Sequence, residues 1–166
     1  MATALLITRD DLVTLTALGG NVDIDKFIQF IKISQDIHVQ NILGTQLLDK
    51  LQEDVIADTL TGNYQILVNK YVKPLLVHWA MAEYLPFAAY TISNKGVYKH
   101  SSENSENVDK NEVDFLIEKE RSIAQHYTER FIDYMSFNQD LFPEYNDNSN
   151  GDMYPDTTNN YTGWFI

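Results

Sequence analysis

Apolar residues recur at helical spacing from Asn63 to Asn94, the most hydrophobic stretch of the chain. We expect a central helix here, with the other helices packed around it and with Leu75 and Trp79 buried. The residues that share the apolar face of this helix are Tyr64, Leu67, Val68, Tyr71, Leu75, Trp79, Ala82, Tyr84, Leu85 and Ala89.

Two prolines interrupt the central helix. Pro74 and Pro86 each lack the backbone N–H that would bond one turn back, so each is expected to bend or break the helix. The pattern therefore predicts a bent rod.

Three helices are predicted before the central one. Thr8 with Asp11 three residues later is close to a capping box, so the first helix begins at Thr8. A longer second helix begins near Asp23 and ends at Gly44, which suits a helix C-terminus. Thr45 is expected to cap the third helix. The apolar stripe of the second helix consists of Ile24, Phe27, Ile28, Ile31, Ile42 and Leu43, and that of the third of Leu47, Leu48, Leu51 and Val55.

The chain becomes polar after the central helix. Residues 95–108 are rich in Ser and Asn and carry no helical stripe, so they are expected to form an exposed loop. A fifth helix, capped by Asp109 or Asn107, then runs to about Phe137. The sequence thus predicts an all-α fold, a small bundle of about five helices with an extended C-terminal tail.

The tail differs in composition from the helical part, which suggests a helical domain at residues 1–137 and an interaction tail at residues 138–166. The tail contains Pro, Gly and six Asn residues but no Lys or Arg, and it keeps many aromatic side chains, which disordered segments normally lack. Docking on another subunit or protein is the favoured interpretation, and folding back on its own helices is the alternative. The expected interaction residues are Phe142, Tyr145, Tyr154, Tyr161, Trp164, Phe165 and Ile166.

Composition narrows the function classes. The chain has 24 acidic and 12 basic residues, a net charge of −12, so its general surface is not expected to grip nucleic acid. It has no cysteine, which excludes disulfides and thiolate metal sites. No signal peptide or membrane-spanning stretch is evident, and an intracellular, soluble protein is expected.

Catalytic and metal-binding motifs are not found. The four histidines are His38, His78, His100 and His126, and none belongs to a zinc or di-iron motif. The acidic residues of the tail do not match calcium-loop spacing. We therefore expect no enzyme, no cofactor and no metal.

Three sequence phrases resemble a known group of proteins. LITRDDL opens the first helix, VQNILGTQLLDKL links the second and third, and YVKPLLVHWAMAEYLPF forms the central helix. Together, over residues 5–135, they resemble the head–tail connector (adaptor or neck ring) proteins of tailed bacteriophages, most closely those of crAss-like phages. The tail is longer and more aromatic than the minimal pattern of that group.

The resemblance implies a structural virion protein without catalysis. Such proteins assemble as a ring, commonly of twelve subunits, beneath the portal protein, and they extend the channel through which DNA passes without specific binding. Portal and neighbouring neck or tail proteins are the implied partners. The implied location is the neck of the virion, with the host cytoplasm during assembly.

Two other classes of function remain open. One is an acidic helical regulator that binds a basic host or phage protein, although its carboxylates are diluted with Lys and Arg. The other is an enzyme with a histidine–carboxylate site built from His78, His126 and Glu83.

Overall fold

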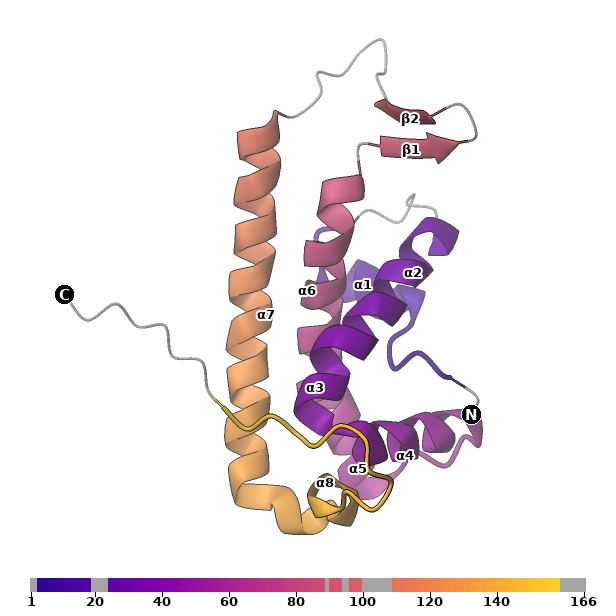
Figure 1. Ribbon diagram of the computed structural model, residues 1–166, viewed down its shortest axis with the longest axis vertical. Helices are drawn as coiled ribbons and strands as arrows, with labels where there is room; N and C mark the ends of the chain where they lie inside the picture. Colours follow the sequence, from indigo (N-terminus) through magenta and orange to yellow (C-terminus); the bar gives the residue numbers. More distant parts are fainter. Residues whose placement is uncertain (1–2, 19–23, 89, 94–95, 100–108, 159–166) are drawn as a thin grey trace, which may run out of the picture.

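The protein is an all-α bundle with one small β-hairpin at its end (Figure 1). The computed structural model describes residues 3–18, 24–88, 90–93, 96–99 and 109–158. The elements are α1 Arg9–Leu15, α2 Ile24–Ser34, η1 Gln35–Val39, α3 Gln40–Leu43, α4 Thr45–Ile56, α5 Gly62–Leu67, η2 Val68–Val72, α6 Lys73–Tyr84, η3 Leu85–Phe87, β1 Tyr90–Ser93, β2 Gly96–Lys99, α7 Lys110–Asn138, η4 Gln139–Leu141 and α8 Pro143–Asn146.

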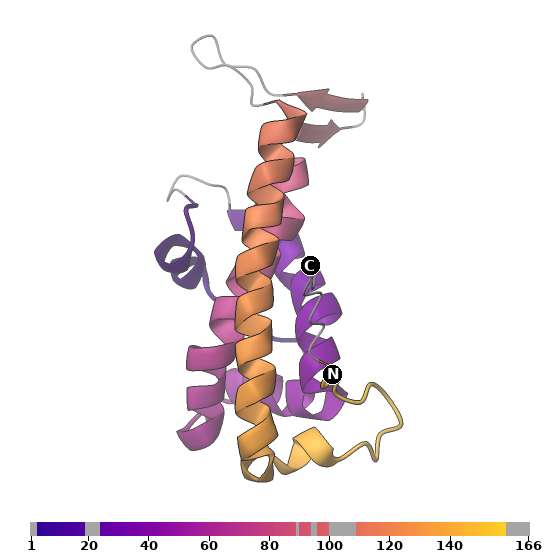
Figure 2. The ribbon, with the colours of Figure 1, turned by 90° about the vertical axis from the view of Figure 1, so that its left-hand side faces the viewer.

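The predicted bent central rod is confirmed as the continuous run α5–η2–α6–η3. The wider π-helical turn η2 ends directly before Lys73 and Pro74, and the tighter 3₁₀ turn η3 contains Pro86, so each irregular turn lies at a proline. Figures 1 and 2 show α6 alongside the long helix α7, with α1 and α2 on its other sides. Surrounded in this way, α6 buries side chains on most of its circumference: Leu75, Leu76, Val77, Ala80, Met81 and Ala82.

Two expectations for the central stretch need correction. Leu75 is fully buried as predicted, but Trp79 is only partly buried, because its ring lies at the edge of the bundle. The rod also ends at Phe87 and not at Asn94, since Tyr90–Ser93 forms strand β1. This strand pairs antiparallel with Gly96–Lys99, in the stretch expected to be a loop. The rest of that expected loop, residue 95 and residues 100–108, lies outside the described residues.

The predicted helix starts are mostly confirmed. Thr8 caps α1 in a capping box with Asp11, and Asp109 caps α7 in a second capping box with Glu112. Burial alone would raise the pKa of Asp11, but hydrogen bonds from Thr8 and the nearby ammonium group of Lys73 outweigh it and lower that pKa.

The second predicted helix is one rod made of α2, η1 and α3. It ends at Gly44, which has a positive φ of 74°. Ile28 on its predicted stripe is exposed, because the buried face of α2 runs through Phe27, Phe30 and Ile31 and leaves Ile28 at its side. Thr45 does not cap α4: Gly44 takes the N-cap position, and Thr45 is the first helical residue.

The predicted boundary between residues 137 and 138 does not separate a domain from a tail. The helix α7 ends at Asn138, and the chain then turns through η4 and α8 underneath the bundle (Figure 2). The hydrophobic core takes in Phe142 and Tyr145 from this segment. Residues 139–158 therefore belong to the same fold, because their side chains complete its lower end.

No helix among the described residues is long and apolar enough to cross a membrane.

Candidate interaction surface

The last described part of the chain, residues 147–158, forms a strap that runs over the junction of α3 and α4. The N–H of Thr45 donates to the carbonyl of Met153 at 3.0 Å, and the N–H of Asp156 donates to the carbonyl of Asn41 at 2.8 Å. The N–H of Met153 in turn donates to the hydroxyl of Thr45 at 3.3 Å. The ends of helices leave such backbone groups without partners, and here the strap supplies them.

Gly44, between the two helices, lets the strap come close. Its φ of 74° is a conformation that other residues rarely adopt, and a Cβ atom there would lie 2.8 Å from Cδ of Pro155 and 3.2 Å from the carbonyl of Met153. Pro155 is buried against this position. Both the turn and the strap contact thus require glycine.

The structure contradicts the expectation that Phe142 and Tyr145 are anchors for a partner. Phe142 is 0% exposed and packs edge-on against the ring of Tyr64, with ring centroids 5.4 Å apart. Tyr145 is 3% exposed, and its burial raises the pKa of its phenol to about 12. Both side chains belong to the core of their own chain, since the Pro143 turn directs α8 back under the helices.

The other expected interaction residues divide into two groups. Tyr154 on the strap is 53% exposed and remains a predicted contact residue. The remaining ones lie outside the described residues and also stay predictions: Tyr161, Trp164, Phe165 and Ile166.

A pocket of about 210 Å³ opens where the end of the strap meets η1, α3, α6 and α7. The rings of His38 and Trp79 stack in it, with centroids 3.8 Å apart and planes 8° from parallel. The indole Nε1 of Trp79 donates to the hydroxyl of Thr128 at 3.1 Å, which fixes the ring against α7. The full lining is Ile37, His38, Asn41, Ile42, Trp79, Gln125, Thr128, Glu129, Ile132, Asp156 and Thr158.

Two of the histidines, His38 and His78, each link two helical elements through a contact with a carboxylate. Nε2 of His38 lies 3.0 Å from Oε1 of Glu83, which links η1 to α6. Nδ1 of His78 lies 2.7 Å from Oε2 of Glu120, which links α6 to α7. The trio of His78, His126 and Glu83 proposed for an enzyme is therefore not brought together: Glu83 faces His38, and His78 faces Glu120.

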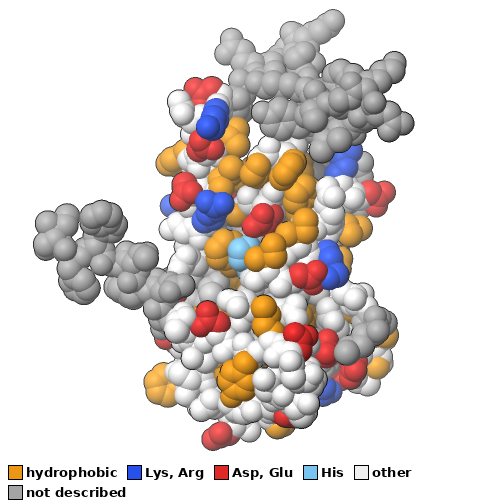
Figure 3. Space-filling view, viewed as in Figure 1, with side chains coloured by type: hydrophobic (Ala, Val, Ile, Leu, Met, Phe, Trp, Pro, Cys, Tyr) orange, Lys and Arg blue, Asp and Glu red, His pale blue; other side chains and the backbone are white. Residues whose placement is uncertain are grey.

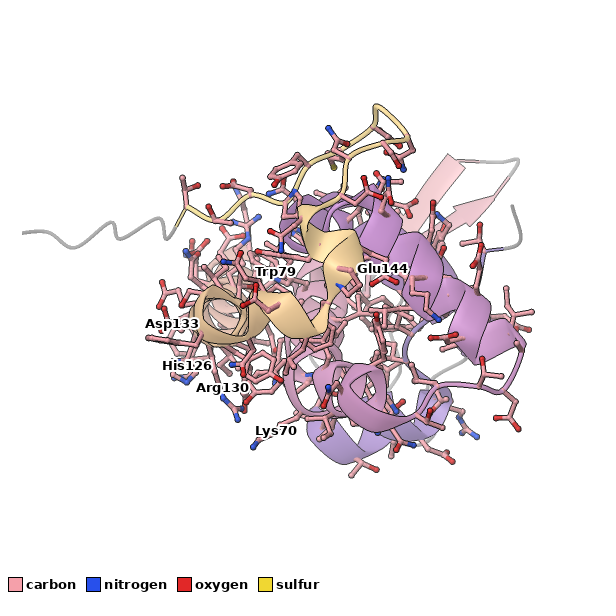
Figure 4. The ribbon with its side chains drawn as sticks, turned by 90° about the horizontal axis from the view of Figure 1, so that it is seen from below. Lys70, Trp79, His126, Arg130, Asp133 and Glu144 are labelled. Carbon is pink, nitrogen blue, oxygen red and sulfur yellow. The ribbon has the colours of Figure 1, made fainter. Side chains whose placement is uncertain are left out.

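His126 has a different setting from the two paired histidines. It is exposed on α7 (Figure 4), whereas the guanidinium of Arg130, one turn further along, lies over the ring of Tyr71. His100 is outside the described residues. Within the part of the chain that the structure describes, no group of three or more His, Asp or Glu side chains is placed to hold a metal ion.

Helix α7 exposes two phenylalanine side chains on its outer face. Phe115 is 69% exposed and Phe137 is 88% exposed. They are 22 positions apart, which places them about 33 Å apart along the axis and within about 40° around it. Both lie on the side of α7 that faces away from buried residues such as Ala124 and Phe131. Neither was predicted from the sequence as a contact residue, because both fall off the apolar stripe of the helix, and that departure was the available signal.

Another part of the surface exposes apolar residues as well. Figure 3 shows hydrophobic side chains gathered over the middle of this face, around a histidine and a carboxylate. Ile37 on η1 is 57% exposed and Phe87 on η3 is 51% exposed, and the Phe87 ring contacts that of Phe30 on α2. We call this surface, together with the His38–Trp79 pocket, the α2–α6 face.

Comparison with known proteins gives one match. No curated protein and no solved structure matches the chain. A family model does match it, over residues 39–155, a stretch that begins in η1 and ends at the Pro155 contact of the strap. This match covers well over half of the sequence, and the chain therefore belongs to the family of unknown function DUF6712.

Proposed function

We propose that the protein is a structural virion protein that forms a neck ring beneath the portal of a tailed bacteriophage. The observation that supports the proposal most is the exposure of apolar side chains at two separate places on one small domain. One is the outer face of α7 with Phe115 and Phe137, and the other is the α2–α6 face with Ile37 and Phe87. Of the two, the α2–α6 face is the contiguous apolar patch, and such patches mark protein–protein contacts, whereas single exposed side chains are common on monomers.

Two different surfaces on one subunit favour a ring. When one surface of a subunit binds the other surface of the next, the contact is head-to-tail, and such contacts close into a ring when the rotation allows it. A ring of twelve is the stoichiometry that the resemblance to neck proteins implies. The portal, further neck or tail proteins and other copies of the chain are the proposed partners.

The charge of the chain suits a passage for DNA. With 24 acidic against 12 basic residues, a channel wall built from this protein repels phosphate and leaves DNA free to slide. We further propose that the protein catalyses no reaction. The paired histidines support this, because each joins two helices through a carboxylate.

The experiment measures particle mass by light scattering, with electron microscopy of the same samples, for the full chain alone and mixed with the portal protein of the same genome. Ring-shaped particles in either sample are the expected result. The variant with both Phe115→Ser and Phe137→Ser should form them at least tenfold less readily. The control is Ile56→Ser, which changes another exposed apolar residue, 53% exposed on α4, and should assemble normally.

Absence of rings in both samples would overturn the proposal. A monomer or dimer that instead binds a basic protein would support the acidic regulator.

A further inference from the structure

The His38–Trp79 pocket has the chemistry that receives one aromatic side chain. Its lining combines aromatic and aliphatic groups such as Trp79 and Ile132 with hydrogen-bonding groups such as Gln125 and Glu129. Its volume of about 210 Å³ is below the roughly 300–1,000 Å³ of typical small-molecule sites. Tyr and Trp, which have an apolar body and one polar group, suit such surroundings.

The segment that follows the strap supplies side chains of this kind. Residues 159–166 read NNYTGWFI and contain Tyr161, Trp164 and Phe165 but no charged side chain. The absence of acidic side chains matters, because Glu129 and Asp156 already line the pocket and would repel them. Charge and size together match this segment to the pocket.

The described part of the strap ends beside the pocket of its own chain, at Thr158. From its hydrogen bond at Asn41, the strap crosses α7 and ends on the side of α7 that faces away from α4 (Figures 1 and 4). Thr158 itself lines the pocket, so Trp164 of the same chain could enter only after an immediate reversal. Six extended residues from Thr158 to Trp164 would span about 20 Å, a reach that allows contact outside its own subunit.

We propose that the pocket binds residues 159–166 of a neighbouring copy of the chain, with Trp164 as the side chain that enters it. The inference rests on the proposed ring and names the contact that closes it. Donor segment and acceptor pocket lie on different parts of each subunit, so every copy binds the next in the same direction, as ring closure requires.

A mixing experiment with two full-length variants tests the contact. Trp164→Ala removes the donor and leaves the pocket intact. Ile37→Asp places a charge on the pocket wall, at a side chain that is 57% exposed, and leaves the donor intact. Neither variant can bind itself, but the pocket of the first can accept the segment of the second. We expect each variant alone to self-associate at least tenfold more weakly than the unchanged chain, and an equal mixture to form a one-to-one heterodimer by light scattering.

The matched controls are Ile66→Asp, the same change at an exposed isoleucine of α5, and Thr162→Ala within the donor segment. Both should self-associate like the unchanged chain. Self-association of Trp164→Ala at the unchanged strength overturns the proposed contact. A mixture without heterodimer also overturns it, and places the segment in its own pocket or on another protein. If these variants still form rings, the contact is wrong while the proposed function stands; if the unchanged chain forms none, even with portal protein, the proposed function fails.

Discussion

Cδ of Pro155 lies 2.8 Å from the position that a Cβ atom would occupy on Gly44. This contact joins residues that are more than a hundred positions apart, at the point where α3 ends and α4 begins. The strap is held by backbone groups at the junction of α3 and α4, where the helical hydrogen bonds are interrupted. Only glycine at position 44 lets the strap come this close, so the attachment of the strap depends on that glycine.

Replacing Gly44 by alanine should destabilise the fold both through its backbone and through the strap. Gly62→Ala is the matched control, because Gly62 also has a positive φ, of 58°, but has nothing within 4 Å of an added Cβ. We expect Gly62→Ala to lower the free energy of unfolding by about 1 kcal/mol, and Gly44→Ala to lower it by roughly 1–3 kcal/mol more, the cost of overpacking. Denaturant unfolding of both variants measures the difference. Equal losses would mean that the strap does not press on Gly44.

Two phenylalanines five positions apart should respond oppositely to truncation. Phe142 is 0% exposed and Phe137 is 88% exposed. Phe142→Ala should lower the free energy of unfolding by about 3–5 kcal/mol, as large core truncations do. Phe137→Ala should change it by less than about 0.5 kcal/mol. Thermal and urea unfolding of the monomer check both values, and a mild effect of Phe142→Ala would restore the idea that the tail starts at residue 138.

The hydroxyl of Tyr64 donates a 2.7 Å hydrogen bond to the carboxylate of Glu144, which ties α5 to α8. Burial and this bond raise the pKa of Tyr64 from 10.0 to about 12. Folding thus favours the neutral phenol, so the stabilisation is complete below pH 10 and is lost as the pH rises to about 12.

Tyr64→Phe should therefore be less stable than the unchanged protein at pH 8, by roughly 1 kcal/mol. The difference should shrink between pH 10 and 12, because the unchanged protein then loses the bond that the variant never had. Urea unfolding across this pH range gives the two curves. Parallel curves would show that Tyr64 does not titrate with folding.

Local signals predicted most helix ends correctly. The capping boxes at Thr8 and Asp109 and the break at Gly44 depend on residues within one turn, so they can be read from the sequence. Likewise, the 3.6-residue period of the central stretch predicted the fully buried position of Leu75.

Features that depend on distant residues were missed. The hairpin follows Pro86, which was interpreted as a bend, and Tyr90–Ser93 continued an apolar pattern compatible with a helix. The strap depends on contacts such as Met153 with Thr45, separated by 108 positions. Nothing in the local pattern around Phe142 distinguishes a side chain that seals its own core from one that binds a partner. The His38–Trp79 pocket was missed for the same reason, since the strap, the rod of η1 and α3, and the helices α6 and α7 form it together.

Particle mass tests the central claim, assembly into a ring, most directly when the full chain is compared with a variant that lacks residues 159–166. Because the proposed contact of this segment is with a neighbouring copy, the variant should keep the melting temperature of the intact monomer within about 2 °C. In the presence of portal protein, the full chain should form a ring-sized particle and the shortened chain should not. A shortened chain that still forms rings would contradict the role of the C-terminal segment. A full chain that forms no ring would contradict the account as a whole.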